Sequence, residues 1–306
     1  MQPQLVASER GRVRAGGWST VGSYVALTKP RIIELLLVTT VPTMVVAEGG
    51  LPSPWLILAT VVGGTLAAGG ANAINMFIDR DIDQLMRRTR HRPLVTGAIR
   101  PRDALVFAIG LEVAAFGLLW LTVNLLSALL AVSATLFYVF VYTLWLKRTS
   151  TSNIVIGGAA GAVPVLVGWA AVRDSLDWAP VYLFAVIFFW TPPHFWALAV
   201  RYRDDYEAAS VPMLPVVASL HTTALRILRY TLILWALTLA FGWAAGLGPL
   251  YGVAAVGLGA AFTWFAVRLL REPTPQVAMR MFTWSITYLT LLFAAMALDE
   301  LLRSGI

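Results

Sequence analysis

Residues 75–93 read Asn-Met-Phe-Ile-Asp-Arg-Asp-Ile-Asp-Gln-Leu-Met-Arg-Arg-Thr-Arg-His-Arg-Pro and lie at the end of a long apolar segment. So many acidic and basic side chains close together are energetically costly at the end of a membrane helix. On a helix, Asn75, Asp79 and Asp83 share one stripe, with neighbouring Cβ atoms roughly 6 Å apart. Asp81 lies about 200° around the axis from Asp79, on a different face. The spacing indicates a site for a metal-bound polyphosphate.

The apolar segment before this motif is one of several. The chain has 306 residues, of which 58% are hydrophobic and 13% charged, and its mean hydropathy is +0.74. A soluble domain of this size could not bury so much apolar surface, so the bilayer is its solvent. We predict nine hydrophobic spans, each long enough to cross a hydrocarbon core of roughly 30 Å. They cover residues 32–48, 54–76, 103–122, 125–145, 154–172, 179–200, 227–246, 249–269 and 281–300.

The positive charges predict the orientation of these spans. With the N-terminus in the cytoplasm, only Arg173 and Arg303 of the 23 Lys and Arg residues fall on the other side. This bias follows the positive-inside rule. The net charge of +7 therefore reflects loops at a membrane and not a nucleic-acid surface. We expect an all-α, polytopic fold of nine transmembrane helices around a central cavity that opens to the cytoplasmic side.

The chain divides into a basic cytoplasmic tail, residues 1–25, and one integral membrane domain, residues 26–306. The tail carries Arg10, Arg12 and Arg14 but no apolar core of a signal peptide. A mitochondrial transit peptide is the alternative for such a tail. We favour the cell membrane, with the N-terminus and the motif loops in the cytoplasm, over the mitochondrial inner membrane. Cysteine is absent, which excludes thiolate nucleophiles and Cys-ligated metals.

A second polar loop faces the same side as the first. Residues 77–102 and 201–226 follow the second and sixth spans, so both open on the cytoplasm. The second loop places Asp204, Asp205 and Glu207 close to Arg201. It is either an ordinary charged loop or the opposing half of the site. In the second case Asp205 holds or orients the metal and Arg201 meets the phosphates.

The first loop also has an ordinary interpretation, as a solvated helix end with surface ion pairs that contribute little. Against it stand the oxygen ligands on one stripe, which suit Mg²⁺. Arg88 and Arg92 follow, and their guanidinium groups suit phosphate oxygens. Lys147 and Arg148 end the fourth span, where they bind phosphate or only satisfy the positive-inside rule. Glycines 157, 158 and 161 are expected to permit close helix packing.

Three polar residues are predicted inside the membrane. His194 follows Pro192 and Pro193, which bend or open the sixth span. It either bonds a carbonyl freed by the prolines, or lines the substrate cavity as a base or as a contact to a planar group. Glu34 and Glu112 are intramembrane acids, which by default face a cavity or a partner.

Further short stretches agree with this interpretation. They are residues 29–31, 75–93, 142–143, 146–148, 153–158, 191–199, 205–206, 212–215, 285, 288–289 and 292–293. Together they resemble the intramembrane UbiA-type prenyltransferase superfamily, and within it the protoheme IX farnesyltransferase (heme O synthase) branch, over residues 26–299. The chain departs from the usual pattern at two places. It has Ser210-Val211-Pro212 where the branch often has Gly before Ile/Val-Pro. It has Arg201-x3-Asp205 where relatives acting on smaller aromatics have two acids at that spacing.

The resemblance implies a Mg²⁺-dependent transferase that joins the farnesyl group of farnesyl diphosphate to a vinyl group of heme B, with water addition. It implies no permanent cofactor besides Mg²⁺, because heme B is a substrate, and it suggests contact with the heme A synthase step. The predicted metal ligands are Asn75, Asp79, Asp83 and Asp205, of which the three aspartates are catalytic. The predicted diphosphate-binding residues are Arg88, Arg92, Lys147, Arg148 and Arg201, and those of the substrate cavity are Asn153, His194 and, from the resemblance, Tyr288.

Two rival functions stay open at this point. A prenyltransferase for another aromatic acceptor, such as a quinone precursor, would use the same diphosphate site. A membrane transporter would instead carry its charges at the bilayer midplane, in inverted repeats. Here the acids crowd one interface.

Overall fold

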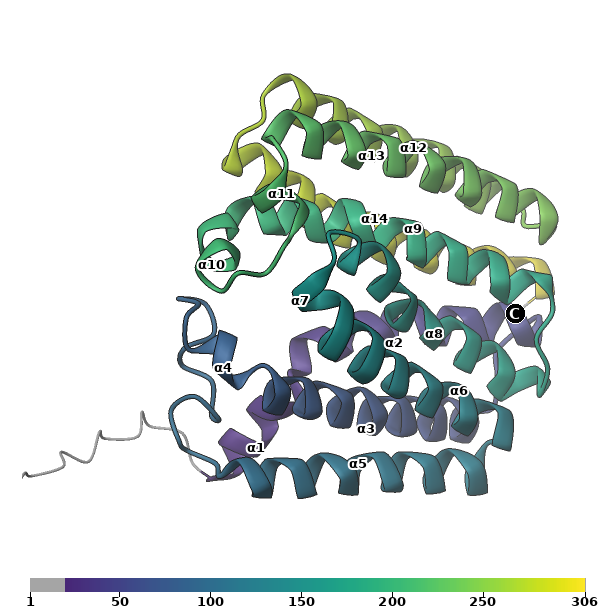
Figure 1. Ribbon diagram of the computed structural model, residues 1–306. Helices are drawn as coiled ribbons and strands as arrows, with labels where there is room; N and C mark the ends of the chain where they lie inside the picture. The colour runs from purple at the N-terminus through teal and green to yellow at the C-terminus, as the bar shows by residue number, and fades with distance from the viewer. Residues whose placement is uncertain (1–19, 306) are drawn as a thin grey trace, which may run out of the picture.

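The chain folds into long helices that run side by side, with short helices gathered at one end (Figure 1). The computed structural model describes residues 20–305, except for the side chains of residues 32 and 34–36, and this part of the chain contains no strand. The long helices are α2 (Pro30–Glu48), α3 (Pro54–Ile78), α5 (Pro101–Thr122), α6 (Leu125–Leu136) continued by η1 (Phe137–Leu146), α8 (Asn153–Arg173), α9 (Trp178–Arg201), α12 (Leu220–Ala244), α13 (Pro249–Arg271) and α14 (Pro275–Ser304). The short ones are α1 (Thr20–Thr28), α4 (Arg80–Asp83), α7 (Lys147–Thr149), α10 (Arg203–Ala208) and α11 (Leu214–Val217).

Eight helices of the described chain are long and apolar enough to cross a membrane, which confirms an all-α, multi-pass membrane fold. They correspond to the second to the ninth predicted spans. The first predicted span, residues 32–48, lies on α2, whose strongly apolar part is shorter, Leu37–Glu48. The count of nine spans therefore stays a prediction. The side chain of Glu34 lies outside the described residues.

Local sequence signals set the helix ends. Proline stands in the first turn of α2, α3, α5, α13 and α14, where its missing N–H leaves no helical hydrogen bond unmade. The side chains of Asn124, Asp177, Ser219 and Thr274 cap α6, α9, α12 and α14 by accepting backbone N–H groups. Gly49 ends α2 with φ 73°, a left-handed conformation that favours glycine.

Two predicted helices begin earlier than hydropathy indicates. The seventh starts at Leu220 instead of 227, and the ninth at Pro275 instead of 281. The extra turns carry Arg226 and Arg280, which lower local hydropathy without interrupting the helix. Helix α9 stays helical across Pro192 and Pro193, so the sixth span does not open there.

The basic tail falls largely outside the described residues. Residues 20–25 of the predicted tail form the first part of α1, which packs against α3. Leu27 is fully buried there, and the rings of Tyr24 and Phe107 lie 4.9 Å apart. The division between tail and membrane domain stays a prediction.

Small residues allow the helices to approach one another, as expected where lipid supplies no hydrophobic driving force between them. A Cβ at Gly157 would lie 2.3 Å from Cδ2 of Tyr142, and one at Gly158 would lie 2.9 Å from Cγ2 of Thr191. These two glycines therefore serve close packing of α8, as predicted. Gly161 has open space where its Cβ would be.

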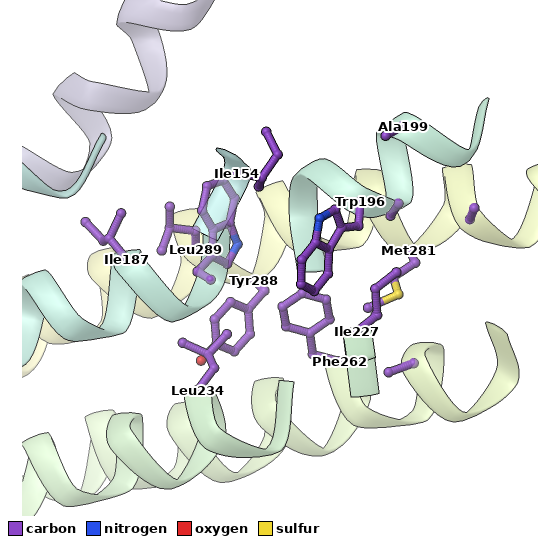
Figure 2. Close-up of a cluster of buried hydrophobic side chains, with 14 of the residues drawn as sticks. Ile154, Ile187, Trp196, Ala199, Ile227, Leu234, Phe262, Met281, Tyr288 and Leu289 are labelled. Atoms are coloured by element: carbon purple, nitrogen blue, oxygen red, sulfur yellow. The ribbon is translucent and has the colours of Figure 1, made fainter. Parts of the chain in front are cut away.

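The packing order brings the first and last long helices together, since α2 contacts both α8 and α14. The largest core lies between α9, α12, α13 and α14, where Trp196, Tyr288 and Phe262 are among the most deeply buried side chains (Figure 2). The rings of Phe262 and Tyr288 are 5.0 Å apart. This core fixes α9, the helix that leads into the second polar loop.

Candidate active site

The three motif residues lie where α3 passes into α4. Asp79 caps the end of α3 and precedes α4, and the backbone hydrogen bonds Asp79 N–H to Asn75 O (2.9 Å) and Asp83 N–H to Asp79 O (2.8 Å) keep the turns helical. Asn75, Asp79 and Asp83 are 3%, 0% and 2% exposed. Carboxylates this enclosed require compensating charge, which the neighbouring elements provide.

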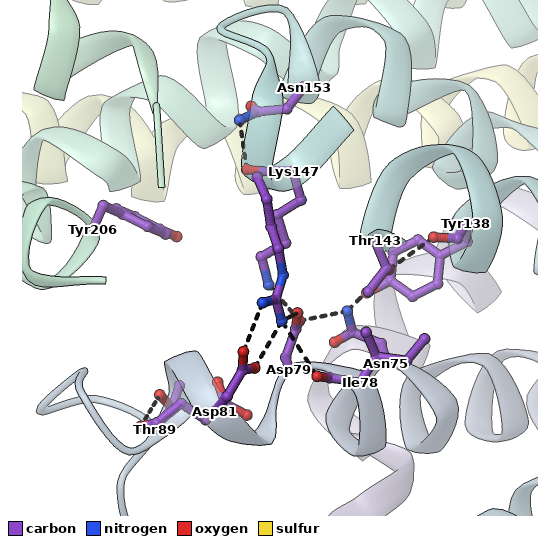
Figure 3. A network of polar contacts seen from close by, with 12 residues as sticks. Asn75, Ile78, Asp79, Asp81, Thr89, Tyr138, Thr143, Lys147, Asn153 and Tyr206 are labelled. Carbon is purple, nitrogen blue, oxygen red and sulfur yellow. Dashed lines mark hydrogen bonds and ion pairs between the residues drawn. The ribbon is translucent and has the colours of Figure 1, made fainter. Parts of the chain in front are cut away.

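Asp79 is held from two sides (Figure 3). Its Oδ2 accepts a hydrogen bond from Asn75 Nδ2 at 2.7 Å and a charged one from Lys147 Nζ. The other oxygen, Oδ1, is buried without a hydrogen-bond partner, and Nη2 of Arg148 lies 3.7 Å from it. A buried carboxylate oxygen in this state is open to a cation that the chain itself does not supply.

Helix η1 positions Lys147. This segment has the wider π-helical turn, a feature common at functional sites. Thr143 is fully buried on η1; its hydroxyl donates to Tyr138 O (2.8 Å) and accepts from Asn75 Nδ2 (3.1 Å). Lys147 follows one turn later and reaches Asp79. Thr143 of η1 and Lys147 at the start of α7 thus fasten this segment to the end of α3 through two contacts.

The loop after α4 folds back on the motif. Arg92 Nη1 lies 2.6 Å from Asp83 Oδ2, and Thr89 donates to the backbone carbonyl of Asp83 at 2.9 Å. Arg92 is 20% exposed and Asp83 is nearly enclosed. An arginine that compensates one carboxylate oxygen retains further N–H donors for an anion.

The two polar loops meet at Arg88. Its backbone N–H donates to Asp205 Oδ2 at 3.1 Å, and its Nη2 donates to the Tyr206 hydroxyl at 3.3 Å. The guanidinium carbon lies 5.1 Å from the ring centre of Tyr202. The Nε of Arg88 is buried without a hydrogen-bond partner. Arg88 therefore keeps an unused side-chain donor, while its backbone N–H holds the carboxylate of Asp205.

Lys29 is a further basic residue of this site, and it was not among the predicted site residues. Its Nζ donates to Asn75 Oδ1 at 2.7 Å, and its backbone has φ 53° just before α2. Burial, with Arg92 and Lys147 nearby, holds the pKa of Lys29 well below its usual value. An anion entering the site would favour the charged ammonium. The signal was present: a lysine directly before Pro-Arg at the start of an apolar segment.

We call these residues the polar cluster: Lys29, Asn75, Asp79, Asp83, Arg88, Arg92, Lys147 and Asp205. It contains four basic side chains and three carboxylates, so it is complementary to an entering polyanion that favours the charged form of Lys29. Tyr142 stacks on Tyr138 beside the cluster, with ring centres 5.4 Å apart.

Asp81 and Arg148 form a separate pair beside the cluster. Two hydrogen bonds of 2.7 Å join the guanidinium to the carboxylate, and Arg148 also reaches the Ile78 carbonyl at 3.3 Å. The hydrogen bonds from Arg148 lower the pKa of Asp81 to about 2. The side chain of Asp81 is 56% exposed. Arg148, predicted to bind phosphate, here ties α7 to α4.

Three other predicted residues lie apart from the polar cluster. Arg201 is exposed at the end of α9 and contacts no carboxylate in the described chain. Tyr288 lies in the hydrophobic core, where its hydroxyl pairs with Thr238 at 2.8 Å. His194 lies within α9 and pairs with Ser285 of α14. Their roles stay predictions.

Asn153 is fully buried at the start of α8. Its Nδ2 lies 3.5 Å from the carbonyl oxygen of Lys147, and its Oδ1 is buried without a partner. The side chain thus supports the end of η1 and keeps a free acceptor. Its predicted place in the substrate cavity is untested.

The donor set of the polar cluster fits Mg²⁺. Its oxygens are hard ligands, and Oδ1 of Asp79 is open. No group of three His, Cys, Asp or Glu side chains in the described chain is arranged to hold a metal by itself. Mg²⁺ does not require one, since it usually binds one or two carboxylates and completes its shell with water and substrate phosphates.

Comparisons with known proteins agree with this geometry. Residues 36–294 match the UbiA prenyltransferase family. A protoheme IX farnesyltransferase from Parafrankia sp. is 55% identical over 296 residues, covering 96% of this chain and 94% of the relative. The protoheme IX farnesyltransferase of Streptomyces avermitilis is 51% identical over 303 residues, covering 97% and 99%.

Solved structures share the fold at low sequence identity. A structure of digeranylgeranylglyceryl phosphate synthase aligns with a TM-score of 0.76 at 17% identity, covering 92% of this chain and 99% of that chain. A UbiA homologue from Archaeoglobus fulgidus bound to DMAPP and Mg²⁺ aligns with a TM-score of 0.66, also at 17% identity, covering 90% and 99%.

Proposed function

The chain belongs to the UbiA prenyltransferase family, and we propose that it transfers the farnesyl group of farnesyl diphosphate to a vinyl group of heme B, which makes heme O. The observation that carries the acceptor is the identity of 51–55% to protoheme IX farnesyltransferases over almost their whole length. The buried polar cluster at the ends of apolar helices supports the diphosphate chemistry. Alone it would indicate only a prenyl diphosphate.

The proposed reaction depends on Mg²⁺. The Archaeoglobus homologue binds DMAPP together with Mg²⁺, and the open Oδ1 of Asp79 favours a divalent cation here. Asn75, Asp79, Asp83 and Asp205 would hold it. When bound, Mg²⁺ supplies charge neutralisation for the leaving diphosphate.

The cations of the polar cluster bind and orient the diphosphate. Arg88 offers its free Nε, Arg92 its remaining N–H groups, and Lys147 and Lys29 their ammonium protons. As the bond between farnesyl C1 and oxygen breaks, its electron pair leaves with the diphosphate. Donors fixed beforehand by Asp79, Asp83 and Asp205 stabilise this charge without reorganising. The farnesyl chain extends from the cluster along the apolar helices.

The acceptor step needs no covalent enzyme intermediate. The π electrons of the heme vinyl group form the new bond to farnesyl C1, which places a positive charge on the vinyl carbon next to the porphyrin. Water adds to that carbon and releases a proton, which leaves a hydroxyethylfarnesyl side chain. Aromatic side chains stabilise the transient cations.

The protein is an integral membrane protein. We place it in the cell membrane with the polar cluster on the cytoplasmic side, because that orientation puts all but two of its Lys and Arg residues inside. Farnesyl diphosphate then arrives from the cytoplasm and heme B from the bilayer. A chain that produces heme O fits a position next to the heme A synthase step.

Mass spectrometry of hemes tests this function. Membranes that contain the protein are incubated with heme B, farnesyl diphosphate and Mg²⁺, and a parallel sample contains EDTA. We expect a new heme that is heavier by farnesol and is absent with EDTA. Unmodified heme in a folded preparation would overturn the acceptor. Quinone precursors offered with the same diphosphate then show whether prenyl transfer itself occurs.

A further inference from the structure

His194 is the one buried histidine of the described chain, and it lies inside the membrane-spanning helix α9. The sequence contains three histidines. His91 is in the loop between α4 and α5, and His221 is exposed in the first turn of α12. His194 is only 7% exposed, inside α9. A neutral imidazole at such a position needs a hydrogen-bond partner for its N–H, and its second nitrogen is an acceptor that also needs a partner.

The hydrogen bonds determine which nitrogen carries the proton. His194 Nδ1 lies 2.7 Å from Ser285 Oγ, and Ser285 Oγ donates to the Phe282 carbonyl at 2.6 Å. A hydroxyl has one proton, and the carbonyl receives it. Ser285 Oγ therefore accepts the Nδ1–H of His194, which leaves Nε2 with a free lone pair. The histidine does not bond a carbonyl freed by Pro192 and Pro193.

The Nε2 atom is not sealed in the core. It makes no hydrogen bond to any described residue, yet it is not among the enclosed polar atoms that lack a partner. Nε2 is therefore not fully enclosed by the described residues. His194 lies on α9, and the residue that caps the end of this helix, Tyr202, stacks on Arg88 of the polar cluster. His194 precedes Tyr202 by eight residues, which is about 12 Å along the helix axis.

The imidazole ring is held rigidly. Trp190 stacks on it at 4.2 Å and 21°, Phe282 lies at 4.6 Å, and Phe195 meets it edge-on at 5.3 Å. The indole N–H of Trp190 donates to the backbone carbonyl of Ser285 at 2.9 Å, which joins α9 to α14 beside the ring. An imidazole fixed through its N–H, with the other nitrogen free, is the arrangement of a metal-ligating histidine.

We propose that Nε2 of His194 is an axial ligand to the iron of the acceptor heme, and that Ser285 is the positioning residue that fixes the tautomer. The inference rests on the proposed function, because it requires heme as substrate. Histidine is a common protein ligand of heme iron, and this chain has no cysteine. Ligation about 12 Å below Tyr202 places the porphyrin between the polar cluster and the membrane interior, where a vinyl group can meet farnesyl C1.

Spectroscopy of bound heme tests the ligand directly. The full chain in phospholipid nanodiscs is titrated with ferric heme B, and its Soret band and electron paramagnetic resonance spectrum are recorded. The variants are His194→Ala and the matched control His221→Ala. We expect His194→Ala to lose the imidazole-ligated signature and to weaken heme B binding at least about tenfold. His221→Ala retains both.

Metal-free protoporphyrin IX separates ligation from packing. It has the same ring, vinyl groups and propionates but no iron. We expect its affinity to change by less than about twofold in His194→Ala. An equal loss for both porphyrins would assign His194 to packing and overturn the inference. So would an unchanged imidazole signature in His194→Ala.

Two further variants keep the test decisive if His194→Ala folds poorly. Imidazole added to His194→Gly is expected to restore the ligated spectrum. In Ser285→Ala we expect the imidazole-ligated spectrum to weaken, and Ser285→Thr, which keeps the hydroxyl, is expected to retain it. Failure of both would overturn the inference. If the wild type makes heme O while the spectrum is independent of His194, only this inference fails. If the wild type binds no heme but prenylates another aromatic acceptor, the proposed function fails with it.

Discussion

Replacing Arg88 by lysine separates the shape of this side chain from its charge. Lysine keeps the positive charge and the backbone N–H that Asp205 accepts at 3.1 Å. It cannot present the planar fork, whose Nε is unpartnered and whose Nη2 donates to Tyr206 at 3.3 Å. It also loses the guanidinium stacking on Tyr202, at 5.1 Å. The variant therefore tests whether two-point phosphate recognition is needed in addition to charge.

The expected cost follows from these contacts. A hydrogen bond to a charged group contributes about 1.5–3 kcal/mol, and an exposed cation–π contact about 0.5–1 kcal/mol. A lysine at this position would recover part of the hydrogen-bond energy and part of the cation–π energy. A net loss of about 2 kcal/mol in transition-state binding corresponds to a decrease of about 30-fold in kcat/KM for farnesyl diphosphate. Because the contact to Tyr206 is long, Tyr206→Phe alone should cost less than about 1 kcal/mol.

The assay is the initial rate of heme O formation at varied farnesyl diphosphate, with the product quantified by mass spectrometry. Arg87→Lys is the matched control, because Arg87 is the preceding residue and is exposed. We expect its kcat/KM to stay within about twofold of wild type, as for other exposed charges. A value for Arg88→Lys within about threefold of wild type, or equal losses in both variants, would refute the two-point recognition of phosphate.

Two further predictions concern packing and pH. Gly157→Ala brings a Cβ to 2.3 Å from the Tyr142 ring and should destabilise the protein by about 1–3 kcal/mol. The control Gly161→Ala places its Cβ in open space. Equal unfolding temperatures of the two variants would contradict the packing role of Gly157. Arg148 holds the pKa of Asp81 at about 2, below its unfolded value, so the pair stabilises the fold above the unfolded pKa of about 4 and this contribution disappears as pH falls through about 2. Thermal unfolding of wild type and Asp81→Asn should therefore differ at pH 7 and converge near pH 2, and a difference that persists there would contradict this linkage.

The sequence predicted the membrane fold from hydropathy and from the position of charge. It located the ends of α12 and α14 less well, because both helices continue past the apolar core with arginines on them. The π-helical form of η1 has no signal of its own, since a run of apolar residues suits either helix. For such elements, tertiary packing decides the outcome.

The candidate site was predicted unevenly, for a physical reason. The spacing of Asn75, Asp79 and Asp83 is local, so a helix places them on one stripe wherever it lies. The pairing of Lys147 with Asp79 and of Arg88 with Asp205 joins residues 68 and 117 positions apart, which depends on how separate helices pack. The role of Lys29 depends in the same way on the turn before α2.

The central claim is that the buried carboxylates at the end of α3 carry farnesyl transfer to heme B. The most direct measurement compares heme O formation by wild type, Asp83→Asn and Asp81→Asn in matched membranes, each shown to be folded by its unfolding transition. Asp83 is enclosed with Arg92, and the side chain of Asp81 is 56% exposed. We predict that Asp83→Asn lowers turnover at least about a hundredfold, while Asp81→Asn stays within about threefold of wild type. Near-wild-type turnover in folded Asp83→Asn, or equal losses in both variants, would contradict the account.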